Sequence, residues 1–321
     1  MIRGLVIGKF MPLHLGHIAL IRFAASQCDE LLVSMTYKPD DPIDGRLRFG
    51  WIKEYFKDDP QIKPAISEDD FDQESLPIDD RTKLWATFIQ KRFPSIDILF
   101  TSEDYGNSFA NDLAIKHISF DRDRKLNPVS ASKIQERPFD YWQFIPEIVR
   151  PFFVKKICFY GPESTGKSAM AKLMAKAYDT EFAPEVAKEI ITSNDFTVDD
   201  IVRIGHAQTE RVKEKLKTAN KILICDTDLI TTEIYSKKYL RVVPEVLFEL
   251  EKETHFDLYF LFDIDVPWVA DGLRDLGNQR EGMLKIFETE LAKRNISFIR
   301  VKGNWAEREA IIKKAIDLLV D

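Results

Sequence analysis

The chain has 321 residues, which is enough for two domains that each bury a hydrophobic core. Hydrophobic residues make up 45% of the chain and charged residues 31%, the proportions of an ordinary globular protein. The net charge of −7 and the pI near 5.5 exclude the basic composition that is typical of a dedicated nucleic-acid-binding protein. A few local lysines and arginines would still suffice to bind a small anionic ligand.

The N-terminus and the cysteines favour a cytoplasmic location. The apolar run 2–7 is too short for a signal peptide, and no apolar run reaches the length of about 18 residues that a membrane span needs. Cys28, Cys158 and Cys225 lie far apart, without the spacing of metal ligands or of a disulfide framework. We expect them to be small buried hydrophobic side chains. The sequence leaves open whether the chain forms a homo-oligomer.

Strands and helices alternate along the first half of the chain. Apolar runs predict strands at residues 2–8, 31–37 and 97–101, and helical periodicity predicts helices at 16–27, 46–56 and 80–93. This alternation is typical of a parallel sheet covered by helices on both faces, in which ligands bind beyond the carboxyl ends of the strands.

A second alternation of the same kind follows a boundary stretch, residues 127–156, that is rich in proline and aromatic residues. It predicts strands at 155–161, 222–226, 258–263 and 296–301, with a helix at 167–178. We therefore expect an α/β protein with two doubly wound parallel-sheet domains, residues 1–150 and 151–321.

The loop that follows the first predicted strand reads GKFMPLHLGH. Gly8 lets the backbone approach a ligand closely, and Gly16 keeps the following helix start open to a polyphosphate, which helix N-termini favour. His14 and His17 are three residues apart, so both can face one ligand. Lys9 adds a positive charge. The candidate residues for catalysis and ATP binding in this motif are Gly8, Lys9, Phe10, His14, Gly16 and His17.

This motif suits the attack of a phosphate oxygen on the α-phosphate of ATP. Such a nucleophile is already ionised, so it needs no general base, and catalysis rests on positioning and charge stabilisation. Two histidines and one lysine without a nearby carboxylate meet that need. The string resembles the G-x-F-x-P-x-H-x-G-H signature of the nucleotidyltransferase superfamily, which implies a Rossmann-like first domain.

The segment VSASKIQ at 129–135 resembles the I-S-x-T-x-I-R segment of the same superfamily. In that superfamily, hydroxyl groups and an arginine hold the ATP phosphates at a helix N-terminus. The resemblance implies that Ser130 and Ser132 supply the hydroxyls and Lys133 a charge. Gln135 stands in place of the arginine, so either a neighbouring cation compensates or adenylyl transfer is weakened.

The second motif, GPESTGKS at 161–168, follows a predicted strand and opens a predicted helix. It matches the G-x-x-x-x-G-K-S pattern of a P-loop, whose backbone N–H groups surround the β-phosphate. Lys167 would reach the β- and γ-phosphates, and the Ser168 hydroxyl would bind Mg²⁺. The ATP-binding residues expected here are Gly161, Glu163, Ser164, Thr165, Gly166, Lys167 and Ser168.

Carboxylates downstream of the P-loop are candidates for the kinase chemistry. Asp226 ends an apolar strand, where it would bind Mg²⁺ or orient a substrate hydroxyl, and Asp228 follows as a substrate contact. The nucleophile of a kinase is a neutral hydroxyl, so a base is useful. Glu185 and Glu189 in the segment PEVAKE would offer carboxylates to a ribose.

The segment WVADGLRDLG at 268–277 has the composition of a lid. Arg274 within it and Arg280 after it would close over the transferring phosphoryl group and stabilise its charge. Trp268 at its start is a further candidate substrate contact.

An adenylyltransferase motif followed by a P-loop kinase motif is similar to the arrangement of the NadR-type bifunctional enzymes. These are nicotinamide mononucleotide (NMN) adenylyltransferases fused to ribosylnicotinamide kinases. The resemblance covers the whole chain, including the segments 101–106, 138–153, 226–232 and 268–277. It implies ATP and Mg²⁺ as cofactors, ribosylnicotinamide and NMN as substrates, and NAD as the product.

On this resemblance Trp85 is a candidate for stacking on the nicotinamide ring, and the equal alternative is a core tryptophan on a helix. Val186 and Lys188 stand where the family often has an aromatic residue and an arginine, a departure that would weaken ribosylnicotinamide binding. Some members carry an N-terminal helix-turn-helix domain, but the first predicted strand begins at Ile2, so we expect no DNA-binding role here.

Two alternatives remain on the sequence. One is a fusion of pantetheine-phosphate adenylyltransferase with dephospho-coenzyme A kinase. Such a fusion would have the same domain order as this chain and similar phosphate motifs. The other is a nucleotide sensor with one inactive site, which the departures at Gln135 and Lys188 keep open.

Overall fold

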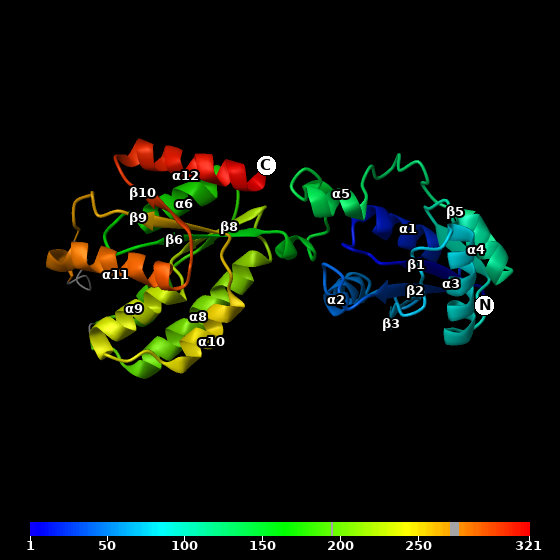
Figure 1. The fold of residues 1–321 in the computed structure, drawn as a ribbon, viewed down its shortest axis with the longest axis horizontal. Coiled ribbons are helices and arrows are strands. Elements are labelled where there is room, and N and C mark those ends of the chain that lie inside the picture. Colours follow the sequence, from blue (N-terminus) through cyan, green and yellow to red (C-terminus); the bar gives the residue numbers. More distant parts are fainter. Residues whose placement is uncertain (194, 270–275) are drawn as a thin grey trace. The chain divides into compact units, whose positions relative to one another are not determined.

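The computed structural model describes residues 1–193, 195–269 and 276–321, and it divides into two compact units, residues 1–149 and 150–321. Each unit contains a five-stranded sheet with helices around it (Figure 1). Every strand pair in both sheets is parallel. This confirms the predicted α/β class with two doubly wound sheets.

The N-terminal unit orders its strands β3-β2-β1-β4-β5. Its elements are β1 (Arg3–Gly8), α1 (Leu15–Ala25), β2 (Glu30–Tyr37), α2 (Gly45–Tyr55), β3 (Ile62–Glu68), α3 (Ile78–Arg92), β4 (Ile98–Thr101), α4 (Gly106–Leu113), β5 (Lys116–Ser119), α5 (Ala131–Glu136) and the 3₁₀ turn η1 (Trp142–Phe144). The chain order reverses around β1, which lies between β2 and β4. Open α/β sheets bind ligands at the carboxyl end of such a strand, and the first motif lies there.

Apolar packing and side-chain caps explain these elements. Helices α3 and α4 pack on the sheet through Ala86 and Phe109, which share a buried cluster with Leu5 and Leu99. The Asp44 carboxylate begins α2 by accepting a hydrogen bond from the backbone N–H three residues on, as N-cap residues do.

The C-terminal unit orders its strands β10-β9-β6-β8-β7. Its elements are η2 (Arg150–Phe152), β6 (Lys155–Tyr160), α6 (Lys167–Ala177), β7 (Phe182–Ala183), α7 (Ala187–Ile190), α8 (Val198–Leu216), β8 (Ile222–Asp226), α9 (Leu229–Leu240), α10 (Glu245–Glu253), β9 (Leu258–Phe262), η3 (Gly277–Gln279), α11 (Arg280–Lys293), β10 (Phe298–Val301) and α12 (Trp305–Val320). The central strand β6 leads directly into the P-loop.

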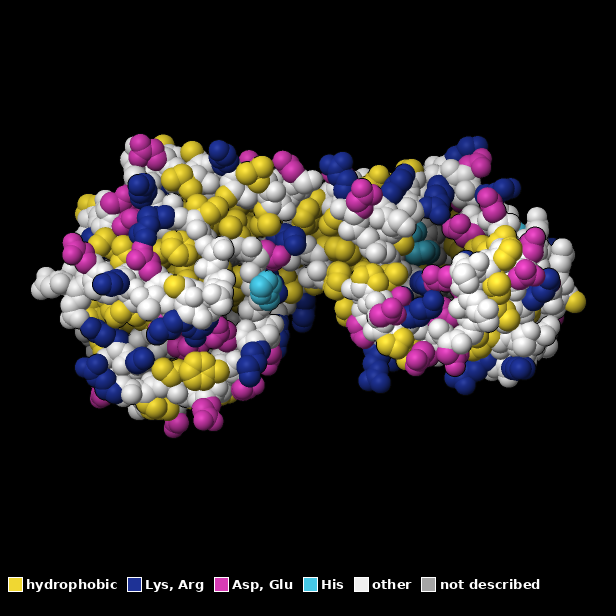
Figure 2. Space-filling model, in the orientation of Figure 1, with side chains coloured by type: hydrophobic (Ala, Val, Ile, Leu, Met, Phe, Trp, Pro, Cys, Tyr) yellow, Lys and Arg dark blue, Asp and Glu magenta, His cyan; other side chains and the backbone are white. Residues whose placement is uncertain are grey.

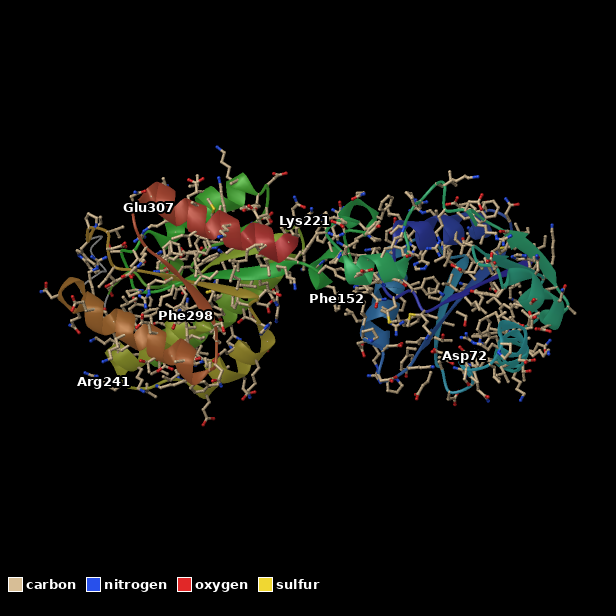
Figure 3. The ribbon with its side chains drawn as sticks, turned by 45° about the horizontal axis from the view of Figure 1, so that its top comes forward. Asp72, Phe152, Lys221, Arg241, Phe298 and Glu307 are labelled. Atoms are coloured by element: carbon tan, nitrogen blue, oxygen red, sulfur yellow. The ribbon has the colours of Figure 1, made fainter. Side chains whose placement is uncertain are left out.

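Capping boxes stabilise the starts of the two longest helices of this unit, and packing against the sheet stabilises α6 and α12. Capping boxes begin α8 at Thr197 and α12 at Asn304, and Glu307 closes the second of them (Figure 3). Met170 of α6 and Ile312 of α12 pack in one buried cluster with the strands. The P-loop therefore leads into α6, a helix that packs against the core of the unit through Met170.

All seven predicted strands are present within two residues of the predicted bounds, but β3, β5 and β7 were not predicted. These three strands lie at or beside the sheet edges and lack a long apolar run. Cys158 and Cys225 are buried, as expected, whereas Cys28 is only partly buried.

None of the described helices combines the length and the apolar composition that crossing a membrane requires. Lysine and arginine side chains are interspersed with aspartate and glutamate over the visible surface of both units (Figure 2).

Candidate nucleotide-binding sites

His14 and His17 lie together at the start of α1. The Nδ1 atom of His14 accepts a hydrogen bond from the backbone N–H of His17 at 3.3 Å, and the two rings stack with centroids 3.6 Å apart. Burial and the charge of Arg124 lower the pKa of His14 to about 3. Burial, His14 and Arg124 lower the pKa of His17 well below its usual range. Both histidines are therefore neutral near pH 7 and can donate hydrogen bonds to a phosphate without adding charge.

Arg124 supplies a positive charge beside these histidines, and the sequence analysis missed it. It lies between β5 and α5, where Nη1 donates to the Val129 carbonyl at 3.2 Å and Nη2 to Glu103 Oε1 at 3.0 Å. In the charged stretch DRDRK no spacing distinguishes Arg124 from Arg122. The sequence therefore carries no signal for its role.

Lys9 has a carboxylate partner, which corrects the expectation of a site without one. Its Nζ lies 2.9 Å from Glu74 Oε1, and Lys38 Nζ lies 3.0 Å from the same oxygen. Hydrogen bonds from Lys9 and Lys38 lower the pKa of Glu74 to about 2. A phosphate that binds Lys9 must therefore compete with an ionised carboxylate.

Gly8, Phe10 and Gly16 shape the loop around the histidines. Phe10 is buried, has a φ of 44°, and places the edge of its ring against His17 with the centroids 5.0 Å apart. A Cβ atom at Gly16 would lie 3.0 Å from the His14 ring, so a side chain there would displace that ring.

A cavity of about 180 Å³ adjoins Gly8 and Lys9 at the carboxyl end of β1. Trp85 lines it, and the rings of Tyr105 and Phe109 meet Trp85 edge-on at 5.1 and 5.7 Å. The Arg81 guanidinium lies 5.2 Å from the Trp85 ring. The structure thus brings Trp85 to the first motif, while Trp85 also packs against the core of the unit.

The segment around α5 meets the first motif through Gln135, whose Nε2 donates to the Met11 carbonyl. The hydroxyl of Ser130 caps α5 by accepting from the Lys133 backbone N–H at 3.4 Å. Ser132 and Lys133 are exposed. The glutamine at position 135 therefore links the two motifs without supplying the charge of the expected arginine.

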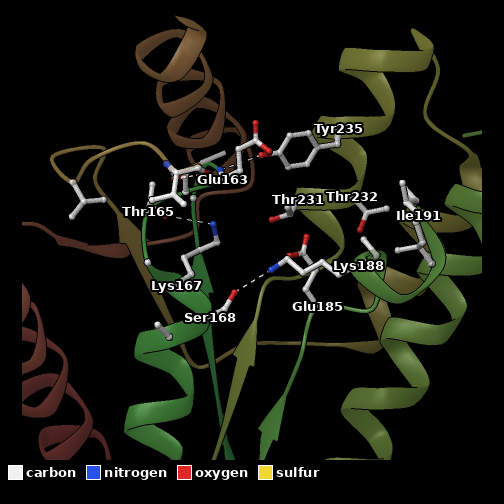
Figure 4. Close-up of a pocket in the computed structure, with 18 of the residues that line it drawn as sticks. Glu163, Thr165, Lys167, Ser168, Glu185, Lys188, Ile191, Thr231, Thr232 and Tyr235 are labelled. Atoms are coloured by element: carbon white, nitrogen blue, oxygen red, sulfur yellow. Dashed lines mark hydrogen bonds and ion pairs between the residues drawn. The ribbon is translucent and has the colours of Figure 1, made fainter. Parts of the chain in front are cut away.

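The P-loop encloses the N-terminus of α6 and lines a cavity of about 620 Å³ (Figure 4). Gly161 and Gly166 have φ values of 133° and 86°, which favour glycine. A Cβ atom at Gly161 would lie 2.9 Å from the Phe262 carbonyl oxygen. Lys167 Nζ donates to the Pro162 carbonyl at 2.6 Å, and burial lowers its pKa. The residues predicted to bind ATP in this motif all line the cavity: Gly161, Glu163, Ser164, Thr165, Gly166, Lys167 and Ser168.

Ser168 and Asp226 fit a Mg²⁺ site. Asp226 is 2% exposed, and its Oδ1 makes no hydrogen bond with any described residue. A hydroxyl and a carboxylate are oxygen ligands of the kind that Mg²⁺ prefers, and substrate phosphates and water usually complete its coordination. Among the described residues no group of three His, Cys, Asp or Glu side chains could hold a metal alone.

The side of the cavity opposite the P-loop is lined by α7, α8 and α9. Glu185 and Lys188 contribute charged groups, and Thr231 and Tyr235 line the same side (Figure 4). Further apolar lining comes from Ile191, Phe196 and Tyr239. The sequence analysis identified Glu185 here but none of the aromatic residues. Tyr235 and Tyr239 have the helical spacing of ordinary core positions, and Phe196 lies in the loop before α8.

Two of the predicted substrate contacts have hydrogen-bond partners within the protein. Glu189 is not among the residues that line the cavity, and it forms two hydrogen bonds of 3.0 Å with Arg211 on α8. Asp228 is buried and caps α9, with its oxygens accepting from Thr231 and from Tyr259. Burial raises the pKa of Asp228 to about 6.

The predicted lid lies partly outside the described residues, and Arg274 is among those outside. Arg280 donates to the Val266 carbonyl at 2.8 Å and to the Ser164 carbonyl at 3.4 Å. It therefore links the P-loop to the segment that follows β9. Trp268 lies 5.8 Å from the Arg280 guanidinium and does not line the cavity. The described part of this segment therefore supports the P-loop.

Two residues at the start of α12 complete the site, and the sequence analysis missed both. Trp305 lines the cavity, is 45% exposed, and would lie 3.5 Å from a Cβ atom at Gly166. Arg308 is fully buried and donates to the Thr165 carbonyl at 2.7 Å. Both residues belong to the first turns of α12, which lie beside the P-loop at Thr165 and Gly166.

Comparison with known proteins gives relatives that align with most of the chain. One of them is the trifunctional NAD biosynthesis/regulator protein NadR of Escherichia coli K12, 33% identical over 329 residues that span 93% of this chain and 78% of the relative. The chain belongs to the NadR family. This confirms the resemblance inferred from the two phosphate motifs.

Other similarities concern parts of the chain or its fold. Residues 156–308 match the model of an AAA domain. A nicotinamide-nucleotide adenylyltransferase of Pyrococcus horikoshii is 28% identical over 118 residues, 35% of this chain and 58% of the relative. A crystal structure of NadR protein in complex with NAD and AMP-PNP shares the fold, with a TM-score of 0.82, 21% identity and coverage of 99% of this chain and 96% of the other.

Proposed function

We propose that this protein makes NAD in two ATP-dependent steps. Residues 151–321 phosphorylate ribosylnicotinamide to NMN, and residues 1–150 transfer the adenylyl group of ATP to NMN, which yields NAD and pyrophosphate. One observation carries the proposal: each phosphate motif follows a central strand and adjoins a cavity for a second ligand, in a chain of the NadR family. The buried thiols of Cys158 and Cys225 suit a reducing compartment, so we propose the cytoplasm as its location.

In the kinase step, the P-loop backbone and Lys167 hold the ATP phosphates. Lys167 must exchange its hydrogen bond with the Pro162 carbonyl for the phosphates. Ser168 and Asp226 would hold Mg²⁺, and the ion would supply positive charge that offsets the charge of the β- and γ-phosphates. The 5′-hydroxyl oxygen attacks the γ-phosphorus, the bond from that phosphorus to the β–γ bridging oxygen breaks, and Glu185 accepts the hydroxyl proton.

The ends of the large cavity have different occupants in this proposal. The γ-phosphate must lie near Asp226 and Glu185, so the acceptor nucleoside occupies the end lined by Thr231, Tyr235 and neighbouring apolar residues. The adenine base then occupies the other end, where the half-exposed Trp305 offers a ring for stacking.

In the adenylyltransferase step, an NMN phosphate oxygen attacks the α-phosphorus of ATP and pyrophosphate leaves. The nicotinamide ring lies in the smaller cavity against Trp85. The neutral histidines donate hydrogen bonds to the α-phosphate, while Arg124 and Lys9 supply the positive charge. No residue needs to accept a proton, because the attacking phosphate is already ionised.

A product assay tests the proposal. Purified protein with ribosylnicotinamide, ATP and Mg²⁺ should form NMN and then NAD, measured separately by chromatography. Lys167→Met should abolish NMN formation and leave NAD synthesis from NMN intact, and His17→Ala should do the reverse. Loss of both activities in either variant would contradict two independent sites.

Two further outcomes would replace the proposal with another function. Dephospho-coenzyme A formed from phosphopantetheine and ATP, without NAD from NMN, would indicate a coenzyme A enzyme. Tight ATP binding at both sites without any product would indicate a nucleotide sensor.

A further inference from the structure

Lys188 occupies the place between the two residues that fit a Mg²⁺ site. Its Nζ lies 3.1 Å from Ser168 Oγ and pairs with Glu185 Oε2 at 2.7 Å (Figure 4). The same Nζ lies 3.7 Å from Asp226 Oδ2. One ammonium group therefore contacts or approaches both predicted metal ligands and Glu185, the base of the proposed kinase step.

A divalent cation cannot share this position with an ammonium group. Two positive charges held within about 4 Å repel each other strongly at the low effective dielectric of a protein cleft. Asp226 is buried in the strand end and cannot move away, whereas the side chain of Lys188 is 51% exposed. Lys188 also extends from α7, a helix of only four residues, on a flexible four-carbon stem. Of the two, the lysine is the group that can leave.

We propose that Lys188 is a displaceable counter-ion of the kinase site. Without nucleotide, its ammonium neutralises Asp226 and Glu185 and excludes free divalent cations. When a divalent cation arrives with ATP, Lys188 moves off Ser168 and Asp226, and its ion pair with Glu185 breaks. Glu185 is then able to accept the proton of the acceptor hydroxyl only after the metal nucleotide is bound.

This inference rests on the proposed function in one respect, that Ser168 and Asp226 hold the divalent cation. The inference also gives a physical reason why a lysine and an arginine at position 188 would act differently. An arginine, which the family often has there, would keep the charge but spread it over a planar group with a different reach. A lysine concentrates the charge on one atom, Nζ, which here lies at hydrogen-bonding distance from the Ser168 hydroxyl.

Binding of Mn²⁺ to the nucleotide-free full-length protein tests the proposal without any measurement of activity. The signal of free Mn²⁺ in electron paramagnetic resonance reports the fraction bound. Lys188→Met should bind Mn²⁺ roughly tenfold more tightly than the unaltered protein, because the competing charge is gone. Lys172→Met, which removes an exposed lysine of α6, is the matched control and should change nothing.

A double variant shows where the gained ion binds. Adding Asp226→Asn to Lys188→Met should return Mn²⁺ affinity to the weak value of the unaltered protein. Equal Mn²⁺ affinity of Lys188→Met and the unaltered protein would overturn the proposal, and so would tight binding that persists in the double variant. If the Mn²⁺ results are as expected but no NMN is formed, the counter-ion stands and the proposed kinase reaction fails.

Discussion

Arg308 offers a decisive test of how the kinase site is held together. The guanidinium is fully buried, and it donates to the carbonyls of Thr165 at 2.7 Å, Gly303 at 3.0 Å and Asp263 at 3.3 Å, and also to the Asp265 carboxylate. It thereby joins the P-loop to the ends of β9 and β10. Arg308→Met keeps a long apolar stem but removes every one of these hydrogen bonds.

The loss of folding stability in Arg308→Met depends on which partners of the guanidinium stay buried. Removing one member of a buried charged pair costs about 3–5 kcal/mol. The Asp265 side chain is 37% exposed and can regain water, so the lower figure of about 3 kcal/mol applies. In a domain of 150–250 residues each kcal/mol shifts the melting temperature by about 2–4 °C, so we expect the kinase unit to melt about 6–12 °C lower.

Calorimetry of the full chain and steady-state kinetics measure both consequences. The P-loop carbonyl of Thr165 loses its tether, so the KM for ATP in the kinase reaction should rise about tenfold, equivalent to about 1.4 kcal/mol. Adenylyl transfer in the other unit should be unchanged. Arg203→Met is the control, since Arg203 forms only an exposed pair with Asp200, and it should shift stability by less than about 0.5 kcal/mol. A melting temperature of Arg308→Met within about 1 °C of the unaltered protein would refute the reasoning.

Three further substitutions test other parts of the two sites. Arg124→Met should lower kcat/KM for NAD synthesis about tenfold or more, and raise the pKa of His14 in an NMR titration, because the Arg124 charge helps to lower it. Trp305→Ala should weaken AMP-PNP binding to the kinase unit about tenfold in calorimetry, since base–aromatic stacking is lost, whereas Trp305→Phe should bind nearly normally. Glu233→Gln should flatten the dependence of unfolding free energy on pH. Burial raises the pKa of Glu233 from 4.5 to about 8, so the folded protein holds a proton that the unfolded chain releases, and stability falls as pH rises through that interval.

Each of these expectations has an opposite outcome. Unchanged adenylyl transfer in Arg124→Met would show that Lys9 alone supplies the charge. Normal AMP-PNP binding in Trp305→Ala would place the base elsewhere in the cavity. Equal slopes of stability against pH between pH 5 and 8 for Glu233→Gln and the unaltered protein would mean that Glu233 does not hold the extra proton.

The sequence by itself determined the features whose causes lie within a few residues. The glycines of the P-loop follow from backbone conformations that only they adopt readily, at Gly161 and Gly166. The contact between His14 and His17 follows from their spacing at a helix start. The strands β1 and β6 follow from the apolar runs LVI and ICFY within them, since the central part of a strand covered on both faces is apolar.

The tertiary structure decided which strands complete each sheet. Strand β3 contains Lys63 and Pro64 and runs along an edge, where only one side must be hydrogen-bonded. Strand β7 is only two residues long and exists because β8 pairs with it. Such segments become strands through a neighbour that lies far away in the sequence, so their own residues hold no sufficient signal.

The tertiary structure also decided which charges surround each motif. Asp226 and Asp228 are two residues apart and identical in type, yet one faces the cleft with Lys188 and the other caps a buried helix. Arg308 reaches Thr165 across 143 residues of sequence. The residues of each motif can be recognised from the sequence, because local backbone geometry requires them and their side chains have a known chemistry. Their charged neighbours depend on how helices and loops from distant segments pack at the carboxyl ends of the strands, and that packing exists only in the folded sheet.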